Sequence, residues 1–459
     1  MININSLEQY TEHAIAKAEN RVDAVIARVK SSVASQIRFS QNDIDISKRW
    51  NNLTLELFIV MNGIKTGFSE SPISILEDID KIVDSTIEFT KHLPDSMLFA
   101  GLEDSVKKYP KVAMNFDKGF DKFTENAPGI ISSSIDSAIS EGAVRVAGAL
   151  KFSKTTSHLS SSLGPEGGRS ETNFDLNIRA FQKELDYSGQ GLACGTIPSN
   201  SEKEMVEAGS KAGRLSKMAL GASSAVPGTY DLIMNPTVAA NVLGSIAESA
   251  NPFYIMIGFS PLQDKIGEQI APEEITVYDD ALYPGGLASH DFDFEGTPAK
   301  TTTIIDKGVM KNLIHNTSTA KMYETESTGN SDILSLGQGM KMLLPGSSNI
   351  VFENGSHTLD EMKDTNRPTI YVTSNWYTRA QNYQTGEFST IPRDAMFLVE
   401  KGEMKPIKNL RLSDNILRMF SSISAVGNDR RQIFWWEVYI PTIIPSIKVS
   451  DCRMTTATQ

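Results

Sequence analysis

The chain has 459 residues, of which 40% are hydrophobic and 22% are charged, a composition typical of a folded globular protein rather than a disordered one. Its net charge is −12, and the absence of a stripe of clustered Lys and Arg argues against nucleic acid as a partner. No stretch approaches the ~18 unbroken apolar residues of a membrane span, and two cysteines are too few for a disulfide framework, so we expect a cytoplasmic protein without membrane attachment.

The first part of the chain alternates between helical and strand-like patterns. Residues 7–19 have the apolar spacing of an amphipathic helix, and residues 73–92 repeat that spacing after a Ser-Pro start. Between them, residues 22–29, 35–46 and 53–60 read as strands, and the Asn62-Gly63 dipeptide that follows is a strong signal for a tight turn. These elements predict a mixed α+β unit.

The pattern changes further along the chain. The segments AVRVAGALKFS (143–153) and NFDLNIRAFQKEL read as strands, the segment YSGQGLACGT as a loop, and residues 202–220 as an amphipathic helix. The small, flexible segment 221–228 (GASSAVPG) then marks the main boundary. We therefore predict an N-terminal α+β domain at 1–225, with a further division near 95–140 left open. A β-rich domain, a barrel or sandwich, follows at 226–459 and carries one helix at 238–249.

Three groups of side chains are candidates for chemistry. The six histidines are widely spaced, the nearest two being 25 residues apart, whereas a helix-borne zinc motif places two imidazoles about one turn apart. Cys194 lies in a Gly-rich segment and would need an activating base, for which His158 is the candidate; an inert thiol is the alternative.

Asp291, Asp293 and Glu295 form the third group, in the segment HDFDFEG. If this segment is a strand, the three carboxylates share one face, and Phe292 and Phe294 occupy the other. Such a face could bind a hard cation or support acid/base work. It could equally be a solvated face, or its carboxylates could accept hydrogen bonds from loop amides, and spacing favours a structural role.

Longer motifs carry a resemblance to a known family. The block GGLASHDFDFEGTPAKTTTIIDKGVMKNLIHNTSTAKMYETESTGN is similar to the "fD.EG … sTGn" block of the TldD/PmbA family, and GTYDLIMNPTVAANVLGS resembles the entry to its C-terminal domain. Further matches are QTGEFS, FLVEKGEMKPI and AVGND downstream, and AVRVAGALKF upstream. The chain is therefore identified as a member of this family. The resemblance assigns a structural or peptide-contacting role to Asp291, Asp293, Glu295, Gly296, Thr328, Gly329 and Asn330.

The resemblance also implies what this chain lacks. In the TldD branch, the helix entering the C-terminal domain carries HExxxH and a late cysteine completes the zinc site, whereas here Gly244, Ser245 and Ser249 stand where the His, Glu and His would be. This is the pattern of the TldE/PmbA branch. It implies a non-catalytic subunit without its own cofactor, paired in the cytoplasm with a TldD-like partner that holds zinc and degrades unfolded or short peptides in a closed chamber.

Whether the chain has any activity of its own stays open, as does the choice between a heterodimer and a homodimer. One alternative is a self-associating peptide-binding or modulator protein without a peptidase partner. A further alternative is a hydrolase that uses Cys194 or the carboxylate segment.

Overall fold

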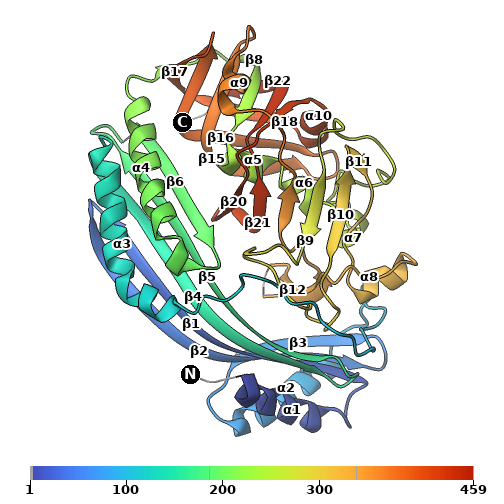
Figure 1. Ribbon diagram of the computed structural model, residues 1–459. Coiled ribbons are helices and arrows are strands. Elements are labelled where there is room, and N and C mark those ends of the chain that lie inside the picture. The colour runs from blue at the N-terminus through green and yellow to red at the C-terminus, as the bar shows by residue number, and fades with distance from the viewer. Residues whose placement is uncertain (1–3, 186, 338, 458–459) are drawn as a thin grey trace.

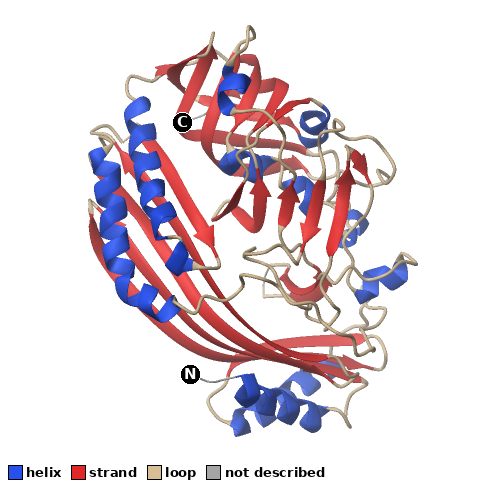
Figure 2. Ribbon diagram, viewed as in Figure 1, coloured by secondary structure: helices blue, strands red, loops and turns tan. Residues whose placement is uncertain are grey.

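The computed structural model describes residues 4–185, 187–337 and 339–457. The fold is mixed α+β and rich in strands, as predicted (Figure 2). Within the described part of the chain, none of the helices has the length and apolar character needed to cross a bilayer.

A long antiparallel sheet, in the order β3-β2-β1-β4-β5-β6, dominates the N-terminal half (Figure 1). Its strands are β1 (Ala24–Ser40), β2 (Asp43–Met61), β3 (Lys65–Pro72), β4 (Arg145–Ser161), β5 (Glu166–Phe181) and β6 (Ser188–Gly195). The tight turn at Asn62-Gly63 is confirmed, with φ of 53° and 70°.

Two predictions for this sheet are wrong. The strand expected at 35–46 is interrupted by the β1–β2 turn, where Gln41 and Asn42 both have positive φ, a backbone form that matches strand twist and that the sequence signals only weakly. The loop expected around Cys194 is instead β6. Its glycines are there for packing: a Cβ on Gly191 would lie 1.9 Å from the carbonyl oxygen of Ala208 in the helix above.

Helices cover one face of this sheet at both of its ends. The helices α1 (Ile4–Ala18) and α2 (Leu76–Lys91), both predicted, pack at one end, and α3 (Phe120–Ser140) and α4 (Glu202–Met218) pack at the other (Figure 1). Along β1, Val25 and Val29 are buried with the first pair and Ile37 and Phe39 with the second. Since side chains alternate along a strand, these odd-numbered residues share one face.

The C-terminal half contains a closed barrel and a second sheet. The barrel runs β15-β8-β22-β18-β16 and closes through pairing of β15 with β16, which confirms the predicted β-rich barrel. The second sheet has the order β11-β10-β9-β14-β21-β20. The barrel strands are β8 (Gly228–Met234), β15 (Thr369–Asn382), β16 (Glu387–Glu400), β18 (Leu410–Asn415) and β22 (Ile447–Thr456). The sheet strands are β9 (Val277–Asp280), β10 (Thr301–Asp306), β11 (Val309–Met310), β14 (Ile350–Phe352), β20 (Arg431–Trp435) and β21 (Val438–Ile444).

Shorter elements complete the second half. The short strands are β7 (Ser223–Ser224), β12 (Ser331–Ser335), β13 (Lys341–Pro345), β17 (Glu403–Lys408) and β19 (Ile423–Val426). The short helices are α5 (Pro236–Val242), α6 (Ser245–Glu248), α7 (Pro252–Met256), α8 (Thr317–Met322), α9 (Leu359–Lys363) and α10 (Ile416–Ser421), in addition to a 3-10 turn at Pro198–Asn200. The single helix expected at 238–249 is therefore wrong: it is broken at Leu243 and Gly244 into α5 and α6.

The two halves share a hydrophobic core. Ile26 and Phe58, on the face of the long sheet opposite to α1–α4, pack in one cluster with Phe292, Phe294 and Leu343 from the C-terminal half. The motif segment around Phe292 and Phe294 therefore fastens the C-terminal half to the long sheet. The predicted boundary at 225/226 stays a prediction.

Candidate functional site

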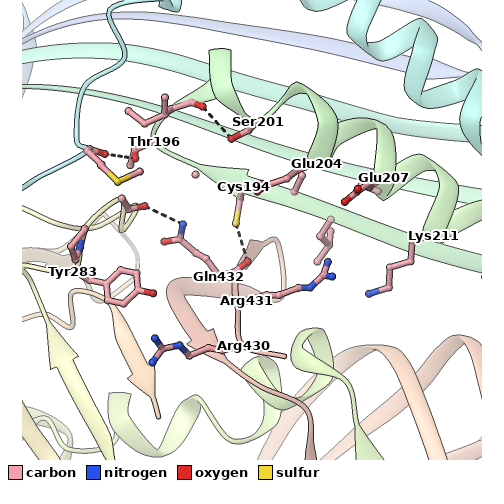
Figure 3. Close-up of a pocket in the computed structure, with 18 of the residues that line it drawn as sticks. Cys194, Thr196, Ser201, Glu204, Glu207, Lys211, Tyr283, Arg430, Arg431 and Gln432 are labelled. Atoms are coloured by element: carbon pink, nitrogen blue, oxygen red, sulfur yellow. Dashed lines mark hydrogen bonds between the residues drawn. The ribbon is translucent and has the colours of Figure 1, made fainter. Parts of the chain in front are cut away.

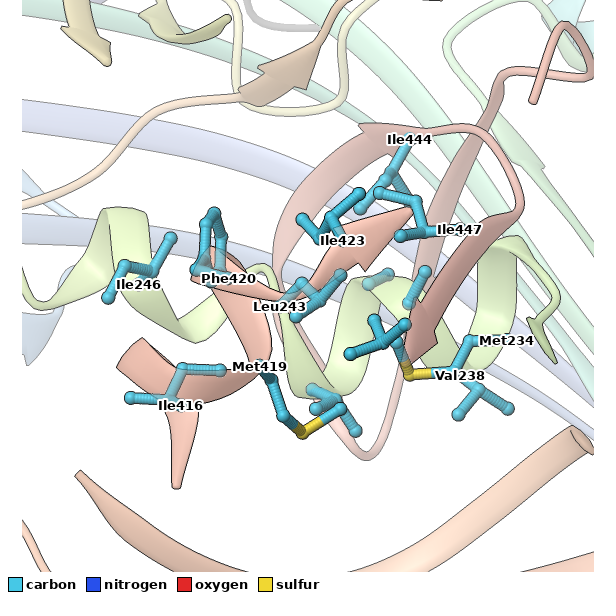
Figure 4. Close-up of a cluster of buried hydrophobic side chains, with 14 of the residues drawn as sticks. Met234, Val238, Leu243, Ile246, Ile416, Met419, Phe420, Ile423, Ile444 and Ile447 are labelled. Atoms are coloured by element: carbon cyan, nitrogen blue, oxygen red, sulfur yellow. The ribbon is translucent and has the colours of Figure 1, made fainter. Parts of the chain in front are cut away.

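The helix pair α5–α6 carries Gly244, Ser245 and Ser249, the three positions at which the sequence resemblance leads us to expect a metal motif. Asn235 caps α5 by accepting a hydrogen bond from the backbone N–H of Val238 at 3.0 Å, and Pro236 occupies the first turn. Val238, Leu243 and Ile246 point into the large apolar core of the C-terminal half (Figure 4). Burial of this face fixes which side of the helix pair can reach solvent.

Of these three residues, Ser245 and Ser249 have side chains that bond to the helix pair itself, and Gly244 has no side chain. The Ser245 hydroxyl donates to the carbonyl oxygen of Val242 at 2.7 Å, and the Ser249 hydroxyl donates to that of Ser245 at 2.9 Å. A Cβ on Gly244 would lie 2.3 Å from the carbonyl oxygen of Ala240, so a larger residue there requires the backbone to move. Zinc prefers imidazole, thiolate and carboxylate ligands. These three residues supply none of them and do not fit a zinc ion.

A cleft of about 470 Å³ opens over α6. Besides Ser245 and Ser249, it is lined by Glu248 and by the aromatic rings of Tyr254, Phe259, Phe388, Tyr383 and Tyr439. Phe259 and Tyr383 stack with their centroids 4.9 Å apart. Desolvation in the cleft raises the pKa of the Glu248 carboxyl, although its side chain still reaches solvent. An aromatic cleft of this kind suits apolar side chains of a peptide.

The carboxylates of the HDFDFEG segment do not form one face of a strand, and that prediction is wrong. The segment is a loop with a left-handed turn at Gly296, where φ is +79°. Asp293 accepts hydrogen bonds from the backbone N–H groups of Glu295 and Thr297 at 2.9 Å and of Ser331 at 2.8 Å. The carboxylate of Asp293 therefore accepts hydrogen bonds from loop amides, which is the alternative that the sequence left open. These bonds make the chain turn rather than extend.

Glu295 and Asp291 tie the same loop to the N-terminal half. Glu295 is fully buried and accepts from the Ser331 hydroxyl at 2.9 Å and from the backbone N–H of Glu103 at 3.3 Å. Asp291 pairs with the ammonium of Lys111 at 3.0 Å. Burial raises the pKa of Glu295 to about 7, and burial together with the charge of Glu295 raises the pKa of Asp293.

The STGN residues form a second buried turn beside this loop. Thr328 donates to the side-chain oxygen of Asn330 at 2.6 Å, and Gly329 has φ of +72°. The Asn330 amide donates to Asp279 at 2.9 Å, and Ser348 donates its backbone N–H to the other oxygen of Asp279 at 2.9 Å. Burial raises the pKa of Asp279 to about 6. Sequence reasoning missed Asp279, because its partners lie 51 and 69 residues away.

Cys194 lines a second and larger cavity, about 750 Å³, between α4, β6 and β20 (Figure 3). Its thiol donates to the carbonyl oxygen of Gln432 at 3.3 Å, and burial raises the pKa of the thiol. His158, the base expected to activate it, is bonded instead to Thr11 at 2.8 Å. Lys211 and Arg431 also face this cavity, and burial, with the nearby Arg431, lowers the pKa of Lys211 to about 8. The environment suits an inert thiol rather than a nucleophile.

Comparisons with known proteins agree on one family. Residues 227–456 match the family model described as the PmbA/TldA metallopeptidase C-terminal domain. The chain is 24% identical over 447 residues to a metalloprotease of Methanocaldococcus jannaschii, covering 94% of this chain and 93% of that one. It is 31% identical over 170 residues to a metalloprotease PmbA homolog of Buchnera aphidicola, covering 37% and 34% of the two chains. The crystal structure of TldE from Thermococcus kodakarensis superposes with a TM-score of 0.83 at 20% identity, covering 97% of this chain and all of that one.

Proposed function

The chain belongs to the PmbA/TldD family of metallopeptidase-like proteins, and on that premise we propose that it is a non-catalytic, cytoplasmic subunit of a peptidase complex. In this proposal a TldD-like partner carries the zinc, and the two chains together enclose a chamber in which unfolded or short peptides are cleaved. One observation carries the proposal: Gly244, Ser245 and Ser249 offer no zinc ligand at the expected motif positions, while the buried hydrogen-bonded turns of the HDFDFEG and STGN segments are complete.

Two features supply a way to hold a peptide. The cleft over α6 has an aromatic lining for side chains, and β6 is the last strand of the long sheet, paired with β5 on one side. Leu192, Cys194 and Gly195 of this strand line the larger cavity. An extended peptide entering that cavity can add to the sheet by backbone hydrogen bonds, which accept many sequences.

The direct test is peptide cleavage by the separate and combined chains. The purified chain, its TldD-like partner, and the co-expressed pair are each given an unstructured peptide at neutral pH, with and without a chelator. We expect cleavage only from the pair, and loss of that cleavage with the chelator or with a partner whose HExxxH glutamate is changed to Gln. Chelator-sensitive cleavage by this chain alone would refute the proposal.

A second candidate is a self-associating peptide-binding protein with no peptidase partner. It is favoured by an apolar patch in which Phe89, Met97 and Met340 are 55%, 90% and 54% exposed around a cavity of about 640 Å³. Large exposed apolar patches commonly mark protein interfaces. Sedimentation of the chain with and without the TldD-like partner separates the two candidates, since a homodimer that ignores the partner supports the second.

A further inference from the structure

His158 is held in place by a hydrogen-bond network under helix α1. Its side chain is only 4% exposed, and Nδ1 lies 2.8 Å from the hydroxyl of Thr11. That hydroxyl also lies 2.9 Å from the backbone carbonyl oxygen of Glu8 and 2.9 Å from the hydroxyl of Ser160. Nδ1 is thereby held by Thr11, a residue of α1. Nε2 is the ring nitrogen that faces Glu166.

Two carboxylates converge on this side of the His158 ring. Glu8 comes from α1 and Glu166 from the start of β5, and one oxygen of each, with the imidazole nitrogen, lies within 4.8 Å of the others. The Nε2–Glu166 distance is 3.7 Å, beyond hydrogen-bond range. Two carboxylates this close repel each other unless a cation lies between them. Burial lowers the pKa of His158 against the opposing effect of Glu166, Glu8 and Glu12, which disfavours a second ring proton as that cation.

The distances suit a small metal ion. Bonds of ~2.1 Å in a tetrahedral site place neighbouring ligand atoms about 3.4 Å apart, close to the 3.7 Å between His158 and Glu166. The ligand atoms of the three residues lie within 4.8 Å of one another. The half-exposed side chain of Glu166 can rotate to bring its carboxylate nearer to the other two ligands. Gly168 pairs with His158 across β4 and β5, and a Cβ there would lie 3.2 Å from the ring carbon Cδ2. The hydrogen bond from Nδ1 to Thr11 is the kind of second contact that orients a ligating histidine.

We propose that Glu8, His158 and Glu166 bind one divalent transition-metal ion of the zinc class, with water completing the coordination. One imidazole nitrogen and two carboxylate oxygens favour Zn²⁺ and related ions over Mg²⁺ and Ca²⁺, which prefer oxygen ligands alone. The ligands come from α1 and from the β4–β5 hairpin, so the ion clamps the N-terminal helix onto the long sheet. The site goes beyond the proposed function and does not depend on it.

The test is zinc binding by the full-length protein after chelator treatment and dialysis. Zn²⁺ is titrated at pH 7.5 in competition with a chromophoric chelator, for the wild type, Glu8→Gln, Glu166→Gln and the matched control Glu19→Gln. Glu19 is an exposed glutamate immediately after the same helix. Circular dichroism shows that each variant is folded, and Ca²⁺ is titrated in parallel.

We expect one equivalent of Zn²⁺ for the wild type and the control, at least tenfold weaker binding for the other two variants, and no comparable binding of Ca²⁺. Saturating Zn²⁺ should also raise the melting temperature of the wild type by about 5 °C, and not that of Glu8→Gln. Failure to bind one equivalent, or equal binding by all four proteins, would overturn the proposal. Zinc held elsewhere in the chain would survive Glu8→Gln, and peptide cleavage is a separate readout, so this result and that of the peptidase test remain distinguishable.

Discussion

The wild-type protein should lose stability as the pH rises from 5 to 8. Replacing Glu295 with Gln should remove a large part of that loss. The carboxyl is fully buried, and burial raises its pKa from an ordinary value of 4.5 to about 7. Because the folded state binds this proton more tightly, the stabilising contribution is complete below pH 4.5 and is lost as the pH rises through 7. At about 1.4 kcal/mol per pKa unit, the wild type loses about 2–3 kcal/mol from this group between pH 5 and pH 8.

The assay is urea unfolding of the wild type, Glu295→Gln and the exposed control Glu12→Gln at pH 5, 6, 7 and 8. Asp279 and Asp293 also have raised pKa values and contribute to the wild-type slope, but both remain in the variant and largely cancel in the difference. The charge of Glu295 helps to raise the pKa of Asp293. The neutral Gln therefore brings the pKa of Asp293 closer to its ordinary value, which enlarges the difference in pH dependence between the variant and the wild type. Parallel stability curves for the wild type and Glu295→Gln over this range would refute the reasoning.

Three further substitutions test the packing that positions the site, each measured by urea unfolding. Phe294→Ala should destabilise the protein by about 3–5 kcal/mol, because the ring is 1% exposed in the core between the halves. The control Phe259→Ala, at an exposed ring, should change the stability by less than about 1 kcal/mol. Equal effects of the two substitutions would contradict this prediction. Asp394→Asn should cost about 3–5 kcal/mol, since its buried carboxylate pairs with Arg179 on β5 at 2.5 Å; an unchanged midpoint would count against it. Gly244→His should cost about 1–3 kcal/mol through overpacking against Ala240, and a neutral effect would show that the helix pair has room for the motif.

The sequence predicted those elements whose signal is local. Helices α1 and α2 follow from an apolar spacing that repeats every turn, and the Asn62-Gly63 turn follows from two residues that accept positive φ. The break between α5 and α6 was not predicted, because Gly244 is held against Ala240 and Thr442, and Thr442 lies nearly two hundred residues further on. The glycines of strand β6 suit turns and so predict a loop, whereas in the fold they let the backbone of α4 pack close to the strand.

The carboxylate segment shows the same limit in the candidate site. Alternation of Asp and Phe predicts a strand, and burial of Phe292 and Phe294 is what that pattern would give. Asp293 turns the chain, because its carboxylate accepts hydrogen bonds from neighbouring backbone amides and from the amide of Ser331, which lies 38 residues away. Spacing cannot reveal a partner at that distance, so the residues were identified but not their arrangement.

The contrast between this loop and the α5–α6 pair explains why the family resemblance predicts fold better than activity. Removing the side chain of Asp293 would leave three buried N–H groups without an acceptor, each at a cost of about 1–3 kcal/mol. Ser245 and Ser249 instead bond to carbonyl groups of their own helix pair, so changes there remove no partner of the buried turns. Folding therefore holds the FD-EG and STGN residues in place whether or not a metal binds nearby. The block is kept for folding, so under the proposed function the metal chemistry depends on positions 244, 245 and 249 and not on this block.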